Sequence, residues 1–169
     1  MERLAGLTLA ELLVVLAVLA LLSMLAVPAL DAAVLNAKRR ATIEALVRGA
    51  WLARVEAARR GRPAVLCASA DGAACAPPGA DWSGGWIVAF PDDPPDVLRR
   101  WPGAGDARAR VLSNRNEFLF QPFERRSTNG TLAWCDRRGA AAARAVVVAT
   151  TGRPRVEAGS GSLPCPAGG

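Results

Sequence analysis

The sequence contains no histidine and no tyrosine, and Lys38 is its only lysine. Histidine is the commonest general base near neutral pH and the commonest zinc ligand, so its absence argues against both kinds of site. Phosphate-binding glycine loops and the G-x-S-x-G pattern of serine hydrolases are also missing. The proline-spaced carboxylates Asp92, Asp93 and Asp96 are typical of a solvated turn. We therefore expect neither an enzyme nor a bound cofactor or metal.

Cysteine is scarce, with only Cys67, Cys75, Cys135 and Cys165 in the chain. There is no C-x-x-C pair, and no histidine is available to complete a zinc site. In an oxidising compartment we expect two disulfides, with free thiols as the alternative, and four cysteines allow three pairings. The most economical pairing joins Cys67 to Cys75, closing a short loop, and Cys135 to Cys165, holding the C-terminal tail.

Polar residues are nearly absent from residues 12–30, where a serine is the only polar residue and Pro28 the only strong helix breaker. About 20 apolar residues suffice for a helix to span a bilayer. A secretory signal cut near Ala26 or Ala33 is one explanation, but its hydrophobic region is usually only ~7–15 residues long. Glu11 also lies at the start of the run, where a charge is costly without a partner. The run therefore predicts a helix that is retained.

The residues before this run read Gly6-Leu7-Thr8-Leu9-Ala10-Glu11. They resemble the class III signal of type IV pilins and type II secretion pseudopilins, in which a glycine, a hydrophobic residue and Thr-Leu-x-Glu precede an apolar helix. The resemblance implies that prepilin peptidase cuts between Gly6 and Leu7, and that the new amino terminus is methylated, although Leu7 replaces the usual Phe. It also implies that Glu11 pairs with the amino terminus of a neighbouring subunit during assembly. A plain single-pass anchor with a chance glutamate is the alternative.

The helical pattern continues beyond the apolar run. Apolar residues at spacings of three and four mark one face, at Ile43, Leu46, Val47, Ala50 and Trp51. The helix should stop at Gly61-Arg62-Pro63, because glycine is common after a last helical turn and proline cannot continue it. One helix is therefore predicted over residues 8–60, with its second half packed on a sheet.

The later part of the chain predicts strands at residues 64–68, 86–90, 117–121, 131–135 and 145–150. Asn129-Gly130 predicts a hairpin turn between two of them. Trp86 and Trp134 are expected in the core, whereas Trp82 and Trp101 lie beside predicted loops, where they could pack or stack on bases. The expected fold class is α+β: a long N-terminal helix packed on antiparallel sheets. The expected domains are a leader peptide (1–6), a transmembrane and assembly helix (7–30) and a periplasmic globular domain (31–169).

The globular half resembles the FimT/GspH group of minor pilins and pseudopilins. The matching segments are residues 57–67, 85–90, 129–135 and 150–155. The last segment contains Gly152-Arg153-Pro154-Arg155, of the form Gly-Arg-x-Arg, which FimT-type minor pilins bear in a C-terminal loop and use to bind DNA. The resemblance implies a minor type IV pilin that binds double-stranded DNA through Gly152, Arg153 and Arg155 for uptake in natural transformation. The alternative is a structural minor pilin or a GspH-like pseudopilin that contacts other pilins and has no DNA role.

The chemistry of this motif agrees with a phosphate site. Gly152 permits a tight bend, Pro154 fixes φ, and a guanidinium group can grip phosphate oxygens bidentately. Residues 108–155 carry ten arginines against three carboxylates, a local excess of +7, in a chain whose net charge is +6. The pairs Arg125-Arg126 and Arg137-Arg138 either extend a phosphate-binding stripe or are solvated loops. With no base-reading element apparent, binding should be independent of sequence and strongly salt-dependent.

The expected partners are double-stranded DNA, other major and minor pilins, the prepilin peptidase and, before assembly, the inner membrane. The expected location is the inner membrane, with the globular domain in the periplasm, and the cell surface once a pilus has assembled. A Cys135–Cys165 bridge is further expected to hold the tail near the Gly152–Arg155 motif, so that a reducing agent would weaken DNA binding.

Overall fold

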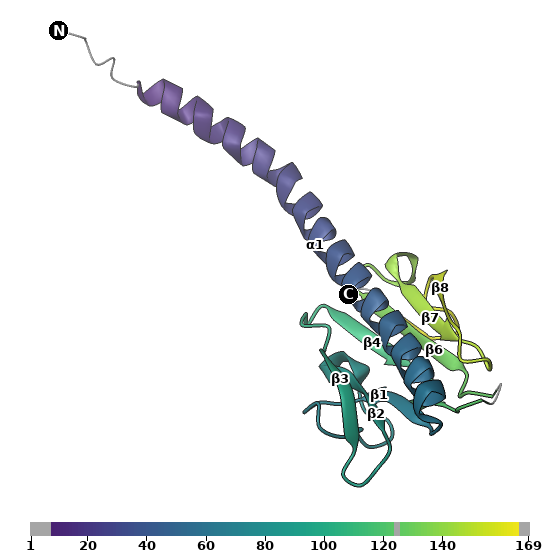
Figure 1. Ribbon diagram of the computed structural model, residues 1–169. Coiled ribbons are helices and arrows are strands. Elements are labelled where there is room, and N and C mark those ends of the chain that lie inside the picture. The colour runs from purple at the N-terminus through teal and green to yellow at the C-terminus, as the bar shows by residue number, and fades with distance from the viewer. Residues whose placement is uncertain (1–7, 124–125, 166–169) are drawn as a thin grey trace. The chain divides into compact units, whose positions relative to one another are not determined.

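The structure is a computed structural model and describes residues 8–123 and 126–165. In this part of the chain one helix, α1 (Leu9–Arg60), precedes eight strands and two short 3-10 turns, η1 (Trp82–Gly84) and η2 (Ala140–Ala142) (Figure 1). The strands are β1 (Ala64–Ala68), β2 (Gly85–Phe90), β3 (Asp96–Pro102), β4 (Ala109–Ser113), β5 (Glu117–Phe120), β6 (Gly130–Asp136), β7 (Arg144–Val148) and β8 (Pro154–Ala158). The chain divides into two compact units, residues 1–37 and 38–169.

The first unit is the apolar part of α1. The backbone N–H of Glu11 donates to Thr8 Oγ1 (3.3 Å), and Leu12 N–H donates to the Thr8 carbonyl (3.2 Å), so Thr8 caps the helix. Thr8 and Glu11, a threonine followed three residues later by a glutamate, have the sequence of a capping box. Two residues of the signal pattern therefore also have a structural role at the start of the helix. The helix is long and apolar enough to cross a membrane, and its apolar segment is not buried within the chain. Gly6 and Leu7, the predicted cleavage site, lie outside the described residues.

The second half of α1 packs on the sheets through a stripe of small residues. Leu46, Ala50, Ala53 and Ala57 are fully buried, at helical spacings of four, three and four. The small alanine side chains allow the helix backbone to approach the sheets closely. Trp51, predicted on this buried face, is 39% exposed, so that expectation was wrong. Because successive residues are rotated by about 100° around a helix, Trp51 points away from the stripe that Ala50 occupies.

The eight strands form two antiparallel sheets of four. The first has the order β3-β2-β1-β5 and the second the order β4-β6-β7-β8. Their inner faces and the alanine stripe of α1 enclose one core, whose largest buried side chains include Trp86, Phe90 and Phe118 from the first sheet and Trp134 and Leu132 from the second. The α+β fold class and the core positions of Trp86 and Trp134 are thereby confirmed.

The predicted hairpin at Asn129-Gly130 is wrong. The strands on either side belong to different sheets, since β5 pairs with β1 while β6 pairs with β4 and β7. Gly130 instead opens β6, where an added Cβ would lie only 2.7 Å from Asn114 Oδ1 and from Arg115 Cγ. The glycine at this position is therefore needed for close packing rather than for a turn.

The η1 turn joins the two sheets. Ser83 Oγ accepts a hydrogen bond from Val111 N–H in β4 (2.9 Å), and the Ser83 carbonyl accepts one from Ala104 N–H after β3 (3.0 Å). Trp82 is buried and meets Phe118 edge to face, with ring centroids 5.9 Å apart. Trp82 is therefore a core residue and is not available for stacking on a base.

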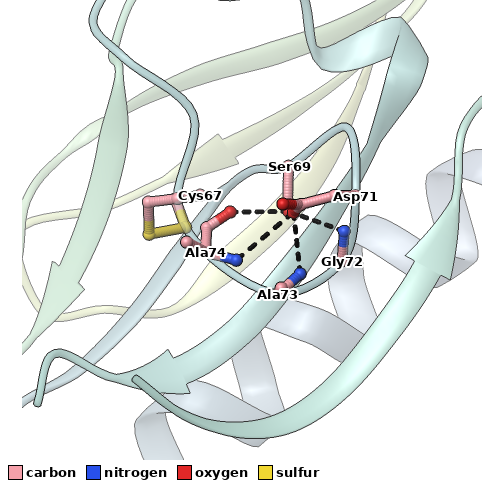
Figure 2. The surroundings of a disulfide bond; sticks show 7 residues. Cys67, Ser69, Asp71, Gly72, Ala73 and Ala74 are labelled. Carbon is pink, nitrogen blue, oxygen red and sulfur yellow. Dashed lines mark hydrogen bonds between the residues drawn. A yellow bond between two sulfur atoms is a disulfide. The ribbon is translucent and has the colours of Figure 1, made fainter. Parts of the chain in front are cut away.

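The structure contains two disulfides, and both have the cysteine pairing that was expected from the sequence. Cys67 bonds Cys75 within a short loop, and Cys135 bonds Cys165, 30 residues later. Figure 2 shows the first loop, in which Asp71 accepts hydrogen bonds from the N–H groups of Ala73 (2.8 Å) and Ala74 (3.3 Å). These bonds lower the pKa of the Asp71 carboxyl and fold the loop on itself.

The second disulfide holds the C-terminal tail against the outer face of the second sheet. Cys135 lies there in a buried cluster with Ala133, Ala143 and Ala145, and Leu163 and Cys165 of the tail pack on this cluster. The tail thus covers apolar surface that would otherwise be open to solvent.

Candidate nucleic-acid interface

The predicted DNA-binding motif begins in the loop between β7 and β8, residues 149–153, which we call the Gly152 loop. Two backbone hydrogen bonds close it, from Ala149 N–H to the Arg153 carbonyl (3.0 Å) and from Gly152 N–H to the Ala149 carbonyl (2.8 Å). Gly152 has φ +73°, and an added Cβ would lie 2.8 Å from Ser127 Oγ. Both the backbone conformation and the space therefore require glycine.

Arg153 and Arg155 occupy different environments. Arg153 is exposed in the Gly152 loop, whereas Pro154 opens β8 and Arg155 lies within that edge strand, opposite Val147. Arg155 Nε donates to Glu157 Oε1 at 2.7 Å, and the two side chains are 60% and 40% exposed. Exposed ion pairs contribute little free energy, so a phosphate can displace Glu157.

Arg153 lines an open depression in the second unit, which we call the arginine groove. Its volume is ≈ 640 Å³, and its lining residues are Arg54, Val55, Ala58, Gln121, Phe123, Thr151 and Arg153. The guanidinium carbon of Arg54 lies 5.3 Å from the ring centroid of Trp51, a cation–π contact. Among the described residues that line the groove there is no carboxylate, so its two positive charges are available to an anion.

Two further arginines lie at the same end of the second sheet. Ser127 N–H donates to the Thr150 carbonyl (2.7 Å), which places the neighbouring, exposed Arg126 beside the Gly152 loop. Arg115 Nε donates to the Asn129 carbonyl (2.8 Å) at the start of β6, whose first residue pairs with the end of β7. Neither Arg115 nor Arg54 lies in a motif that the sequence alone identifies. Arg125, a predicted member of the stripe, lies outside the described residues.

The predicted pair Arg137-Arg138 lies at the other end of β6. That strand runs from Gly130 to Asp136, which separates its ends by about 20 Å at ~3.3 Å per residue. Arg138 grips the buried Asp136 bidentately, with Nε–Oδ1 2.9 Å and a terminal nitrogen 2.7 Å from Oδ2. Arg138 therefore stabilises the fold, and neither Arg137 nor Arg138 is brought to the Gly152 loop.

The Cys135–Cys165 disulfide is also remote from the loop, because Cys135 precedes Asp136 at this far end of β6. The Gly152 loop is held instead by its own hydrogen bonds and by Ser127. The expectation that this bridge holds the Gly152 loop in place was therefore wrong.

Asp136 should make stability depend on pH. Hydrogen bonds from the Arg138 side chain, despite burial, lower the pKa of its carboxyl to about 2. The ionised form is thus favoured in the folded state, and its contribution is present above about pH 4 and lost as the pH falls towards about 2. We expect Asp136→Asn to lower the free energy of unfolding by about 2 kcal/mol at neutral pH.

Urea unfolding of both proteins, followed by near-ultraviolet circular dichroism, measures this difference. Glu44→Gln is the matched control, because Glu44 forms an exposed pair with Arg48 on α1 and should change little. If the difference in free energy of unfolding between wild type and Asp136→Asn stays constant from about pH 6 to about pH 2.5, the ionised Asp136 carboxylate does not contribute to stability in this way.

Comparisons with known proteins agree with this architecture. No curated protein sequence matches the chain. Two crystal structures of the type IV minor pilin FimU from Pseudomonas aeruginosa strain PAO1 are similar. The first, in space group P21, has 20% identity and a TM-score of 0.56, covering 70% of this chain and 87% of FimU. The second, in space group P65, has 19% identity and a TM-score of 0.55, covering 70% and 91%.

At this level of identity the two structures show a shared pilin fold. The family described as Type II transport protein GspH matches residues 42–152, which is more than half of the chain and includes Gly152. This match confirms the family resemblance drawn from the sequence, while the closer likeness to FimT stays a prediction. The chain therefore belongs to the GspH family of pilin-like proteins.

Proposed function

We propose that this chain is a minor type IV pilin that binds extracellular double-stranded DNA, without regard to sequence, for uptake in natural transformation. The observation that carries the proposal is the position of Arg153. A glycine turn presents this exposed arginine at the edge of a groove that contains Arg54 and, among its described lining residues, no carboxylate. Arg155, on the adjoining edge strand, is held only by an exposed pair with Glu157.

Phosphate contacts by arginine account for the expected mode of binding. Arg126 and Arg115 lie at the same end of the second sheet as Arg153, so a duplex crossing this end would meet positive charge along its backbone. Three to four phosphate contacts predict that the logarithm of affinity falls against the logarithm of salt concentration with a slope of about −3. Such contacts fix position on the duplex and carry no sequence information.

The first unit would hold the chain in a filament. Prepilin peptidase would cut between Gly6 and Leu7, and Leu7 would then carry the methylated amino terminus. The exposed apolar helix would be held in the inner membrane, with the globular unit in the periplasm, and later packed against other pilins. Glu11 would pair with the amino terminus of a neighbouring subunit, because an isolated carboxylate in an apolar setting is costly.

A structural minor pilin or type II secretion pseudopilin is the second candidate. It is favoured by the family description, Type II transport protein, and by the apolar surface of α1, which suits assembly whether or not DNA is bound. In that case the arginine groove would have no part in function.

Removing the two motif arginines should separate these candidates. We expect Arg153→Ala/Arg155→Ala to weaken binding of an unrelated DNA duplex by about 10-fold to 100-fold, because charge-assisted hydrogen bonds to phosphate are lost. Fluorescence anisotropy with the full-length chain in an uncharged detergent, at two salt concentrations, measures the change. Glu157→Gln should have the opposite effect, since it frees Arg155.

The charge-matched control is Arg40→Ala/Arg99→Ala, which removes two exposed arginines, one from α1 and one from β3. Binding should persist in this variant with only a small loss. If both double variants lose affinity equally, the motif has no specific role. If the wild type does not bind duplex at low salt, duplex is not its ligand, and if it binds no DNA in any form, the structural candidate stands.

A further inference from the structure

We propose that the arginine groove receives a single unpaired base, stacked on Phe123, so that the chain binds single-stranded DNA and frayed duplex ends more tightly than closed duplex. This inference rests on the proposed DNA-binding function and assigns a base-binding role to a residue outside the Gly-Arg-x-Arg motif. Its starting point is an exposed aromatic ring at the groove.

Phe123 does not serve the core. Its side chain is 86% exposed, whereas Phe90, Phe118 and Phe120 are fully buried. Its backbone has φ +57°, the only positive φ among the described residues other than glycine. That conformation costs an aromatic residue roughly 1–2 kcal/mol. A strained backbone that holds an apolar ring in solvent is unfavourable for the free protein, and such strain is often found at binding sites.

The surroundings of the ring suit a nucleotide. Phe123 lines the groove together with Arg54 and Arg153, which supply positive charge for a phosphate. Val55 and Ala58 of α1 add apolar surface. An aromatic face beside arginines is the combination by which single-strand binders hold bases and backbone together.

Gln121 also lines the groove and offers a base a polar partner. Its side-chain amide offers both donors and an acceptor, so it suits any of the four bases and would not impose a strong sequence preference. The groove volume of ≈ 640 Å³ lies within the range of about 300–1,000 Å³ that small-molecule sites occupy. The open groove is therefore large enough to receive one base.

The geometry also explains a preference for unpaired DNA. A base inside a closed duplex has both faces covered by its neighbours and would have to leave the stack, at a cost of a few kcal/mol, to reach Phe123. A base in a single strand or at a frayed end avoids most of that cost. Phosphate contacts by Arg153 and Arg155 remain available to both forms, so duplex binding depends on the arginines alone.

The test compares a fluorescent oligothymidylate with a blunt duplex of mixed sequence, using the full-length chain in uncharged detergent. We expect Phe123→Ala to weaken single-strand binding about 10-fold, since stacking contributes ~1–3 kcal/mol per base, and to change duplex binding less than about 2-fold. Phe123→Trp should retain single-strand affinity, because the larger ring still stacks. Circular dichroism checks that each variant is folded.

The outcomes separate this inference from the proposed function. If duplex binds through Arg153 and Arg155 but Phe123→Ala binds both DNA forms as the wild type does, the stacking role is overturned and the proposed function survives. If neither form binds to the wild type, both fail. If only the single strand binds, and Phe123→Ala loses it, the stacking role is supported and the assignment of duplex as the ligand is overturned.

Discussion

Replacing Gly103 with alanine should destabilise the second unit by more than about 4 kcal/mol, enough to unfold many domains of this size. A Cβ at Gly103 would lie 1.9 Å from the Ser83 carbonyl oxygen and 2.6 Å from the Gly84 carbonyl carbon. These are backbone atoms of η1, which cannot move aside as a flexible side chain can. Ser83 is also hydrogen-bonded to Val111 in the other sheet, so a displacement of η1 disturbs both sheets.

Tryptophan fluorescence during urea unfolding measures this effect well, because all five tryptophans lie in the second unit and the apolar part of α1 has none. Gly84→Ala is the matched control in the same turn. Gly84 has ordinary backbone geometry, and a Cβ there would meet nothing within 4 Å. A Gly103→Ala variant as stable as Gly84→Ala would show that η1 does not hold the sheets together.

Removing the second disulfide, with Cys135→Ser/Cys165→Ser, should lower the free energy of unfolding by about 3–4 kcal/mol. The bridge spans 30 residues and, in the chain-entropy account, restricts the unfolded chain more than a shorter one does. The tail would also lose its hold on the outer face of the second sheet. Because Cys135 lies at the far end of β6 from the Gly152 loop, DNA affinity of the folded variant should be unchanged.

Cys67→Ser/Cys75→Ser is the comparison, with an expected loss of about 2–3 kcal/mol because its loop spans only 8 residues. Urea midpoints give the stabilities, and anisotropy at a temperature where each variant is folded gives the affinities. If the folded Cys135→Ser/Cys165→Ser variant loses DNA binding, the Cys135–Cys165 bridge does hold the Gly152 loop.

The sequence predicted the elements whose signal is strong and local. The helix was expected at residues 8–60 and is found at Leu9–Arg60, because a long apolar run, a helical face and Gly61 with its positive φ all agree. The five predicted strands correspond to β1, β2, β5, β6 and β7. Both faces of β1, β2 and β6 are covered, so the residues of these three strands are apolar almost throughout.

The edge strands β3, β4 and β8 were missed. Each is partly exposed and contains arginine, and β8 also begins with Pro154, so none has the continuous apolar pattern of a buried strand. For this reason Arg155 was predicted in a loop although it belongs to a strand. The false hairpin at Asn129-Gly130 has the opposite cause: its local signal was strong, but packing against Asn114 decides the position of Gly130.

The candidate interface was predictable only in part. Gly152, Arg153 and Arg155 form a continuous motif, whereas Arg54 and Phe123 reach the groove from α1 and from the segment after β5. Nothing in the sequence alone brings such separate segments together. The same limit applies to charge, because counting arginines could not show that Arg138 is bound to Asp136 while Arg153 faces an open groove.

The edge position of β8 has a consequence for aggregation. An open strand edge can pair with the edge of another copy of the chain and grow into an unwanted fibre. Pro154 offers no N–H to such pairing, and the charged Arg155 and Glu157 follow it along the same edge. Pro154, Arg155 and Glu157 thus protect this strand edge against aggregation, and one of them, Arg155, is also proposed to hold DNA.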